Sequence, residues 1–269
     1  MTFDEEYYNI GLLDRLSYKN TLMHRLDPRV KLIATLFFLF TVISFSKYEV
    51  SALFPFFLYP VLLMTLGEIP FWFIFKKVLL VSPFALFIGI FNPLLDSGQV
   101  VILPGLTLSA GWLSFSSILL KFVLTVSAAL LLVATTSFPT ICHALRQIGI
   151  PSVFVSQLLF LHRYLFVLME EAVRIVRACN LRSFGRNGIG VKVFIRIVGV
   201  LFLRTVERAE RVYFAMTARG FHGDMPTRKQ HRIKPHDFIF AASMAVFLIS
   251  FRFYPVSNII GRYLQELFQ

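Results

Sequence analysis

The sequence is poor in the patterns that build most catalytic and metal sites. Its two cysteines, Cys142 and Cys179, form no CxxC pattern that would indicate a metal or redox centre. Its six histidines have no ligand-like spacing with one another or with a carboxylate on a helix face. A Walker A motif is absent, and no spacing argues for a Ser/His/Asp or Cys/His arrangement. The sequence therefore predicts a chain with no catalytic residues, no metal ligands and no bound cofactor.

Acidic residues are scarce, since 15 Asp and Glu face 27 Lys and Arg and give a formal net charge of +12. Residues 139–235 hold 16 of the basic residues but only five acidic ones. A basic region of this kind is the usual mark of nucleic-acid binding, but here the charges interleave with long apolar faces. The positive-inside rule of membrane proteins explains the bias more simply. We therefore predict that residues 139–235 are cytoplasmic, bind no nucleic acid and keep both cysteines reduced.

Long hydrophobic runs are abundant. The chain is 57% hydrophobic and 16% aromatic, with 31 Phe and a mean hydropathy of +0.70. This composition predicts an all-α, polytopic helical membrane protein in the lipid bilayer, with about five transmembrane helices and long amphipathic cytoplasmic helices. The acidic N-terminus lacks the basic n-region of a cleaved signal peptide, so the first span is expected to stay in place. The expected spans are residues 30–45, 50–66, 78–91, 113–137 and 238–254.

The loops between these runs set the expected topology. Residues 92–113 contain no Lys or Arg and several turn formers, which is typical of an external loop. With a cytoplasmic N-terminus, five spans leave residues 139–235 inside and the C-terminus outside. The expected organisation is an amphipathic lead-in with four spans in residues 1–138, a cytoplasmic helical region in 139–235, and a last span with its tail in 236–269. Lys121 is the one charge in the fourth span, where it either snorkels or has a function.

A short pattern occurs twice, 37 residues apart, in the basic region. Positions four residues apart lie on one face of a helix, so each copy predicts a charged helix face followed by a small residue and an aromatic. The first copy is Glu170, Arg174, Ala178, Arg182 and Phe184, and the second is Glu207, Arg211, Ala215, Arg219 and Phe221.

Two interpretations of this duplication remain open. Glu170 with Arg174, and Glu207 with Arg211, are i,i+4 pairs that support a helix by a few tenths of a kcal/mol on any view. An arginine at the end of each helix also complements the helix dipole. However, the helices begin with apolar stretches that must pack on each other or on a partner. On that view the exposed arginine ends dock on something with two equivalent halves.

The chain resembles the transmembrane (T) component of energy-coupling factor transporters, and within that family the cobalt-uptake type. The resemblance covers nearly the whole sequence. Besides the two arginine-containing helix ends, it is carried by LDPRVKL at residues 26–32, ALRQIGIP at 144–151 and LHRYLFVLMEE at 161–171.

The resemblance implies a non-enzymatic subunit, multi-pass in a bacterial or archaeal plasma membrane. Its partners would be two ABC-type ATPase subunits, which hold ATP and Mg²⁺, and a metal-binding membrane subunit that carries the substrate. Each coupling helix of such a component places an Ala-Arg-Gly-like tip in a groove of one ATPase. Ala218-Arg219-Gly220 matches that tip fully, whereas Leu181-Arg182-Ser183 keeps only the arginine.

Several functions stay open at this point. The resemblance favours an importer for cobalt, with nickel second and a vitamin third, because the substrate is chosen by the separate membrane subunit. A different class, an autonomous secondary transporter or a small-ion channel, is weakened because the sequence shows no intramembrane acidic pair and no conspicuous inverted repeat.

Overall fold

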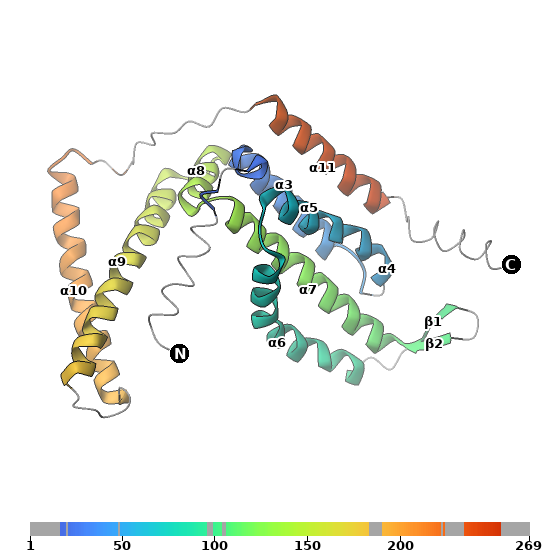
Figure 1. The fold of residues 1–269 in the computed structure, drawn as a ribbon, viewed down its shortest axis with the longest axis horizontal. Helices are drawn as coiled ribbons and strands as arrows, with labels where there is room; N and C mark the ends of the chain where they lie inside the picture. The colour runs from blue at the N-terminus through green and yellow to red at the C-terminus, as the bar shows by residue number, and fades with distance from the viewer. Residues whose placement is uncertain are drawn as a thin grey trace. The chain divides into compact units, whose positions relative to one another are not determined.

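The computed structural model describes residues 17–19, 21–47, 49–95, 99–103, 106–182, 190–221, 223 and 234–253. Helices dominate the described residues, which confirms the all-α membrane class (Figure 1). The chain divides into two compact units. We call residues 15–137 with 231–269 the bundle unit, and residues 138–230, which the division joins with 1–14, the arm unit. The domain boundaries expected from the sequence stay a prediction.

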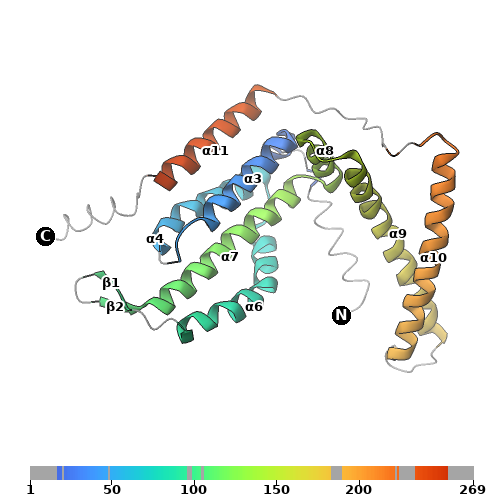
Figure 2. The same ribbon diagram turned by 180° about the vertical axis from the view of Figure 1, so that it is seen from behind.

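Most of the described helices belong to the bundle unit, and the described residues of the arm unit form three helices. Figures 1 and 2 show these elements. The elements of the bundle unit are α2 (Leu22–Arg25), α3 (Pro28–Ile43), α4 (Val50–Leu53), the 3-10 helix η1 (Phe54–Phe57), α5 (Leu58–Gly67), α6 (Phe71–Leu95), β1 (Gln99–Leu103), β2 (Leu106–Ser109), α7 (Ala110–Thr135) and α11 (Pro235–Phe253). The arm unit contains α8 (Phe138–Ile148), α9 (Ser152–Arg182) and α10 (Val191–Thr217).

Five stretches of the described chain are long and apolar enough to cross a membrane, which is the number expected. They are Val50–Gly67, Phe71–Pro93, Gly111–Thr135, Ser152–Arg182 and Pro235–Phe253. Four of them coincide with expected spans. Helix α3, the expected first span, has only 16 residues and is not among the five. Helix α9 is among them, because it is long and its first half is apolar. A helix as short as α3 extends only about 24 Å.

Helix α7 lies at the centre of the bundle unit, packed against α3, α5 and α6. Its buried face follows helical spacing through Leu124, Ala128 and Leu131, all without exposed surface. Small residues let the helices approach closely, as is usual in membranes. Gly89 of α6 lies so near α7 that a Cβ there would be 2.9 Å from the Phe115 ring. The same α6 contains Pro83 and Pro93 and bends along its length (Figure 1).

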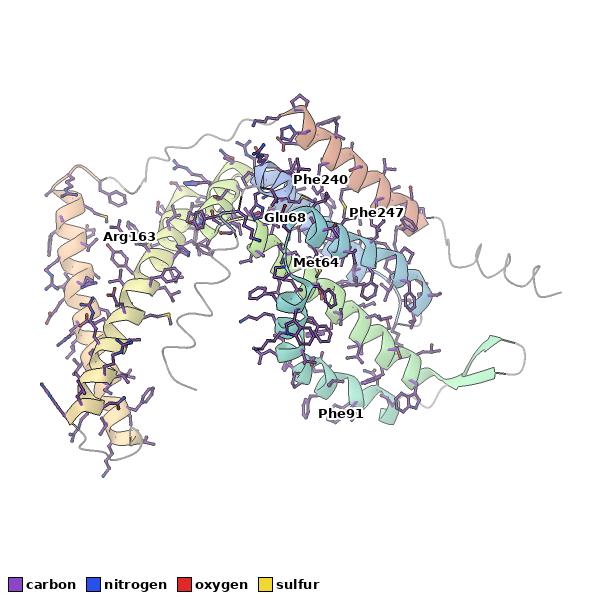
Figure 3. The ribbon with its side chains drawn as sticks, in the orientation of Figure 1. Met64, Glu68, Phe91, Arg163, Phe240 and Phe247 are labelled. Carbon is purple, nitrogen blue, oxygen red and sulfur yellow. The ribbon has the colours of Figure 1, made fainter. Side chains whose placement is uncertain are left out.

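The irregular positions of the bundle unit have identifiable causes. Pro55 falls in η1, where the backbone tightens to a 3-10 helix, because a proline lacks the N–H and distorts a helix. Glu68 follows α5 with a φ of 51°, in the left-handed region, and its carbonyl accepts a hydrogen bond from Lys19 Nζ at 3.0 Å. It lies at the turn between α5 and α6 (Figure 3). The expected external loop contains an antiparallel hairpin, β1–β2.

Charged side chains fix the N-terminal end of α3 to two other helices. Asp237 of α11 accepts the backbone N–H of Asp27 at 2.8 Å through Oδ1 and that of Lys234 at 2.7 Å through Oδ2. Lys31 Nζ donates to the carbonyl of Thr135, the last residue of α7, at 2.9 Å. Asp27, Lys31 and Asp237 are each at most 4% exposed. Buried charges of this kind persist only when they are paired and hydrogen-bonded.

The C-terminal end of α3 is held by the same two helices. Lys121 Nζ of α7 donates to the carbonyl of Phe45 at 2.6 Å. Arg252 of α11 donates to Ser44 Oγ at 3.1 Å, and its guanidinium lies 4.5 Å from the centre of the Phe45 ring. Lys121 therefore holds the backbone just after α3 to α7, which is a structural role for the one charge of the expected fourth span.

Asp237→Ala should destabilise the bundle unit, because two backbone N–H groups lose a charged acceptor in a buried place. We expect a loss of about 2–4 kcal/mol, measured by thermal unfolding in detergent. Asp237→Asn keeps one carbonyl acceptor and should lose clearly less. The exposed Ser243 of the same helix is the control, and Ser243→Ala should change stability little. Equal stability of Asp237→Ala and the parent would contradict the role given to this carboxylate.

Candidate functional site

The arm unit begins with α8, which packs against α9. Cys142 and Ala144 are fully buried on α8, and the ring of Phe138 stacks on that of His162 with centroids 4.9 Å apart. Gly149 ends α8 with a φ of 112°, while the N–H of Ile150 donates to the carbonyl of Leu145. This is a glycine-terminated helix end, and it separates α8 from α9.

Helices α9 and α10 form an antiparallel pair (Figures 1 and 2). Glu171 in the second half of α9 forms an ion pair with Arg204 of α10. At the other end, the ring of Phe160 near the start of α9 meets that of Phe221, just after α10, edge to face at 6.3 Å. Because the helices run in opposite directions, Arg182 and Arg219 lie at opposite ends of the pair. With 27 residues, α10 separates them by roughly 40 Å.

A groove of about 520 Å³ lies between the first half of α9 and the second half of α10. The two helices therefore approach at the Glu171–Arg204 ion pair and leave open space beyond it. The lining side chains are mostly apolar or aromatic: Gln157, Phe160, Tyr164, Leu168, Thr205, Val206, Arg208, Ala209, Val212, Tyr213 and Met216. Figure 3 shows the side chains of both helices, with Arg163 on α9 marked. The pair thus lacks a packed core along part of its length.

The second arginine tip, residues 218–220, has a defined backbone shape. The N–H of Phe221 donates to the carbonyl of Met216, and that of Gly220 to Thr217, both at 3.0 Å. These two bonds, with Gly220 at a φ of 78°, make a Schellman motif that stops the helix. Only glycine adopts this φ without strain, so the glycine of the tip is required by the turn. Arg219 is thereby presented, exposed, on the last residue before the chain reverses.

The chain after the second tip is fastened to α9. Besides the contact between Phe160 and Phe221, Ser156 Oγ donates to the carbonyl of Gly223 at 3.4 Å. The repeated aromatic of the sequence pattern thus has a packing role in its second copy, where it anchors the tip. Its first-copy equivalent, Phe184, lies outside the described residues.

The first tip is described in part. Arg182 is the last residue of α9, and Leu181 beside it is 83% exposed. Ser183 lies outside the described residues, so the structure neither supports nor opposes its assignment to this tip. Within the described part of the chain, neither Arg182 nor Arg219 pairs with a carboxylate, and both are exposed. Two unpaired guanidinium groups are available to acidic or carbonyl groups of a partner.

The expected Glu–Arg pairs form on the helix surfaces. Arg174 lies 2.5 Å from Glu170, and Arg211 lies 3.8 Å from Glu207. All four side chains are more than half exposed, so each pair stabilises its helix by only a few tenths of a kcal/mol. The ion pair from Glu171 to Arg204, which joins the two helices, was missed. No sequence spacing signals it, because the partners lie on different helices 33 residues apart.

Among the described residues, no group of three or more His, Cys, Asp or Glu is arranged to hold a metal ion. The described part of the arm unit instead presents two exposed arginines at the ends of a long helix pair. Such an arrangement suits docking to a partner at two separated points.

The comparisons with known proteins give the class of this chain. A family model described as a cobalt transport protein matches residues 19–232. The chain is 26% identical over 230 residues to the energy-coupling factor transporter transmembrane protein EcfT of Staphylococcus aureus, covering 80% of this chain and 85% of the relative. It is 27% identical over 228 residues to EcfT of Bacillus subtilis, covering 79% and 85%. A stretch of 100 residues is 34% identical to the cobalt transport protein CbiQ of Salmonella typhimurium, covering 36% and 44%.

The fold and these similarities define a multi-pass membrane component of a transporter. The chain belongs to the CbiQ family and is a T component of the energy-coupling factor type. This confirms the resemblance drawn from the arginine-containing helix ends.

Gly220→Ala should weaken the second tip, because alanine at a φ of 78° costs about 1 kcal/mol of backbone strain. The space around Gly220 is open, so no steric clash adds to this cost. Amide hydrogen exchange at residues 217–221 should become faster. Gly199→Ala is the matched control, since Gly199 also has open space but lies within α10, where alanine favours the helix. Unchanged exchange in Gly220→Ala would show that the turn does not depend on its glycine.

The two cysteines should react very differently with maleimide. Burial raises the pKa of the Cys142 thiol to about 11, so at pH 7.5 it stays protonated as well as inaccessible. Cys179 is partly exposed on α9. Mass spectrometry of the folded chain should find Cys179 modified first, and Cys142 modified only after denaturation. Rapid labelling of Cys142 in the folded chain would contradict its burial.

Proposed function

We propose that the chain is the transmembrane coupling subunit of an ATP-driven importer, which transmits the motion of an ATPase pair to a separate substrate-binding membrane subunit. The observation that carries this proposal is the α9–α10 pair, with an unpaired arginine at the C-terminal end of each helix and a separation of roughly 40 Å between the ends. Two similar contact points at opposite ends of one helix pair suit a partner with two equivalent grooves.

Two ABC-type ATPase subunits are the proposed partners at these tips. One would receive Arg182 and Ser183, and the other Ala218, Arg219 and Gly220. The ATPases would hold ATP and Mg²⁺, while this chain carries out no chemistry. The relatives named energy-coupling factor transporter transmembrane proteins support this division of labour. Arginine suits the tips because it remains charged and offers a planar fork of donors.

The geometry of the arm unit suggests how motion would pass through the chain. Helices α9 and α10 are joined at Glu171 and Arg204 and enclose a groove between the first half of α9 and the second half of α10. A change in the distance between the two tips would therefore alter the angle between the helices with little repacking of side chains. The anchor between Phe160 and Phe221 makes the second tip move with the first half of α9. We propose that closure of the ATPase pair drives this change and that α9 carries it toward the membrane.

Cobalt is the proposed substrate, bound by the partner membrane subunit. The family description as a cobalt transport protein and the similarity to CbiQ support it. Nickel remains the second choice and a vitamin the third, since many of the relatives carry the general name EcfT. The proposed orientation has a cytoplasmic N-terminus and an external C-terminus in a bacterial or archaeal plasma membrane. The alternative function, from a different class of protein, is that of an autonomous secondary transporter.

Replacing the tip arginines should uncouple transport from ATP. Arg219→Ala and Arg182→Ala should each lower ATP-dependent cobalt uptake in vesicles containing the whole complex, by roughly tenfold if each guanidinium contributes a charged hydrogen bond. The double variant Arg182→Glu with Arg219→Glu should also lose co-purification with the ATPases. A larger effect at Arg219 is expected, since its tip matches the Ala-Arg-Gly pattern fully.

The controls remove the same charge from the same helices away from the tips. Arg174→Ala and Arg211→Ala break only exposed i,i+4 pairs, so uptake should stay within about twofold of the parent. Two outcomes would reject the proposal: undiminished uptake in the double variant, or uptake by this chain alone without ATPases, which would favour the autonomous transporter.

A further inference from the structure

The bundle unit contains an apolar groove between α3 and α11. Its volume is about 490 Å³. We call it the α3–α11 groove, and it is lined by Val30, Ile33, Ala34, Phe37, Thr41, Ala241, Met244, Ala245, Leu248, Ile249, Arg252 and Phe253. Ala34, Met244 and Leu248 are nearly buried and form its floor, while the more exposed apolar side chains form its walls.

The groove exists because of how α11 is attached. The two ends of α11 are held to the ends of α3, because Asp237 accepts a hydrogen bond from the backbone N–H of Asp27 and Arg252 donates one to Ser44 Oγ. Between these ends, Ala34, Ala241 and Ala245 face the space between α3 and α11, and their small side chains do not fill it. On its other side, α11 contributes Phe240 and Phe247, marked in Figure 3, to a second pocket shared with α5. Helix α11 is therefore fixed by polar contacts at its ends, with open space on both sides.

The dimensions of the groove match one lipid chain in one leaflet. From Val30 to Thr41 it follows α3 for roughly 17 Å, about half of the ~30 Å hydrocarbon thickness of a bilayer. Both helices are apolar, and α11 meets the criteria for a span. An open apolar groove on such helices is filled by hydrocarbon, because neither water nor an empty space is favourable there.

One end of the groove carries a positive charge. Arg252 is exposed, and among the described residues its guanidinium contacts Ser44 and the Phe45 ring but no carboxylate. A guanidinium has five N–H donors, and only those of Nη2 are used for Ser44. The remaining donors match phosphate oxygens, which guanidinium groups bind in pairs. Apart from Arg252 and Thr41, the lining is apolar.

From this geometry we propose that the α3–α11 groove binds one anionic phospholipid. One acyl chain lies along the floor formed by Ala34, Met244 and Leu248, and the phosphate receives hydrogen bonds from Arg252. The lipid substitutes for side-chain packing between α3 and α11 and completes the bundle unit. The site depends on the membrane location of the chain and is independent of the ATPase partners.

Native mass spectrometry of the detergent-purified full chain tests the proposal, with dioleoyl phosphatidylglycerol and dioleoyl phosphatidylcholine as the probes. The parent should retain one phosphatidylglycerol in preference to phosphatidylcholine. Arg252→Gln should lower that preference about tenfold, since it removes a charged hydrogen bond to the phosphate. Arg252→Lys, which keeps the charge, should lose less. Equal loss of both lipids in Arg252→Gln would overturn the assignment of the headgroup.

A second pair of variants tests the groove itself. Ala245→Trp fills it and should abolish retention of the lipid, whereas Ala242→Trp, on an exposed position of α11 outside the lining, should leave retention unchanged. Size-exclusion chromatography checks that both variants are folded, and Ala245→Leu is a milder replacement if Ala245→Trp is not. Lipid retention by folded Ala245→Trp or Ala245→Leu equal to that of the parent would overturn the proposal.

Photocrosslinking of the unmodified chain tests the groove without a substitution that could alter the fold. Phosphatidylglycerol with a diazirine on one acyl chain should label peptides that contain Ile33, Phe37 and Ile249 more strongly than the exposed Leu80 and Phe84 of α6. Uniform labelling of α3, α6 and α11 would show that lipids merely surround the helices and would overturn the site. Uniform labelling is also expected if a protein segment, and not a lipid, covers the groove, and it would overturn the proposal in that case too.

Discussion

Helix α3 is joined at both ends to the same two helices, and the joints are hydrogen bonds made by charged groups. At one end Asp237 of α11 accepts from Asp27, and Lys31 donates to the last residue of α7. At the other end Lys121 of α7 donates to the carbonyl of Phe45, and Arg252 of α11 donates to Ser44. Apolar contact between helices in lipid is weakly directional, so these four points set the arrangement of α3, α7 and α11. The α3–α11 groove results from the same arrangement, since contacts at the ends leave the middle unfilled.

Local features were predictable because they depend on residues close in sequence. The surface pairs of Glu170 and Glu207, and the end of the second charged helix face at a small residue, Gly220, follow from short-range rules. The class and number of apolar helices followed from composition. The assignment of α3 as a membrane span was less predictable, because α3 has only 16 residues and hydrogen bonds to α7 and α11 hold its end in place.

Contacts between distant residues were not predictable from one sequence. Asp27 and Asp237 are 210 residues apart, and no local pattern indicates that the Asp237 carboxylate accepts the backbone N–H of Asp27. Glu171 and Arg204 sit in ordinary mixed-charge stretches, and only the antiparallel course of α9 and α10 brings them together. The β1–β2 hairpin lies in a segment interpreted as an external loop, because its turn formers were evident and its short strands were not. The docking role of the tips remains a proposal, although the Schellman turn at Gly220 gives the second tip a fixed shape.

The distance along the chain between Asp27 and Asp237 has a consequence for biosynthesis. Helix α3 is made before α11, and the carboxylate of Asp237, which accepts the backbone N–H of the α3 N-cap residue Asp27, belongs to α11. Until α11 is inserted, the end of α3 carries Lys31 and Asp27 with their interhelical contacts incomplete. Completion of the bundle unit is therefore coupled to the synthesis of α11. A chain without α11 leaves the backbone N–H of Asp27 without its charged acceptor, at a place that is otherwise buried.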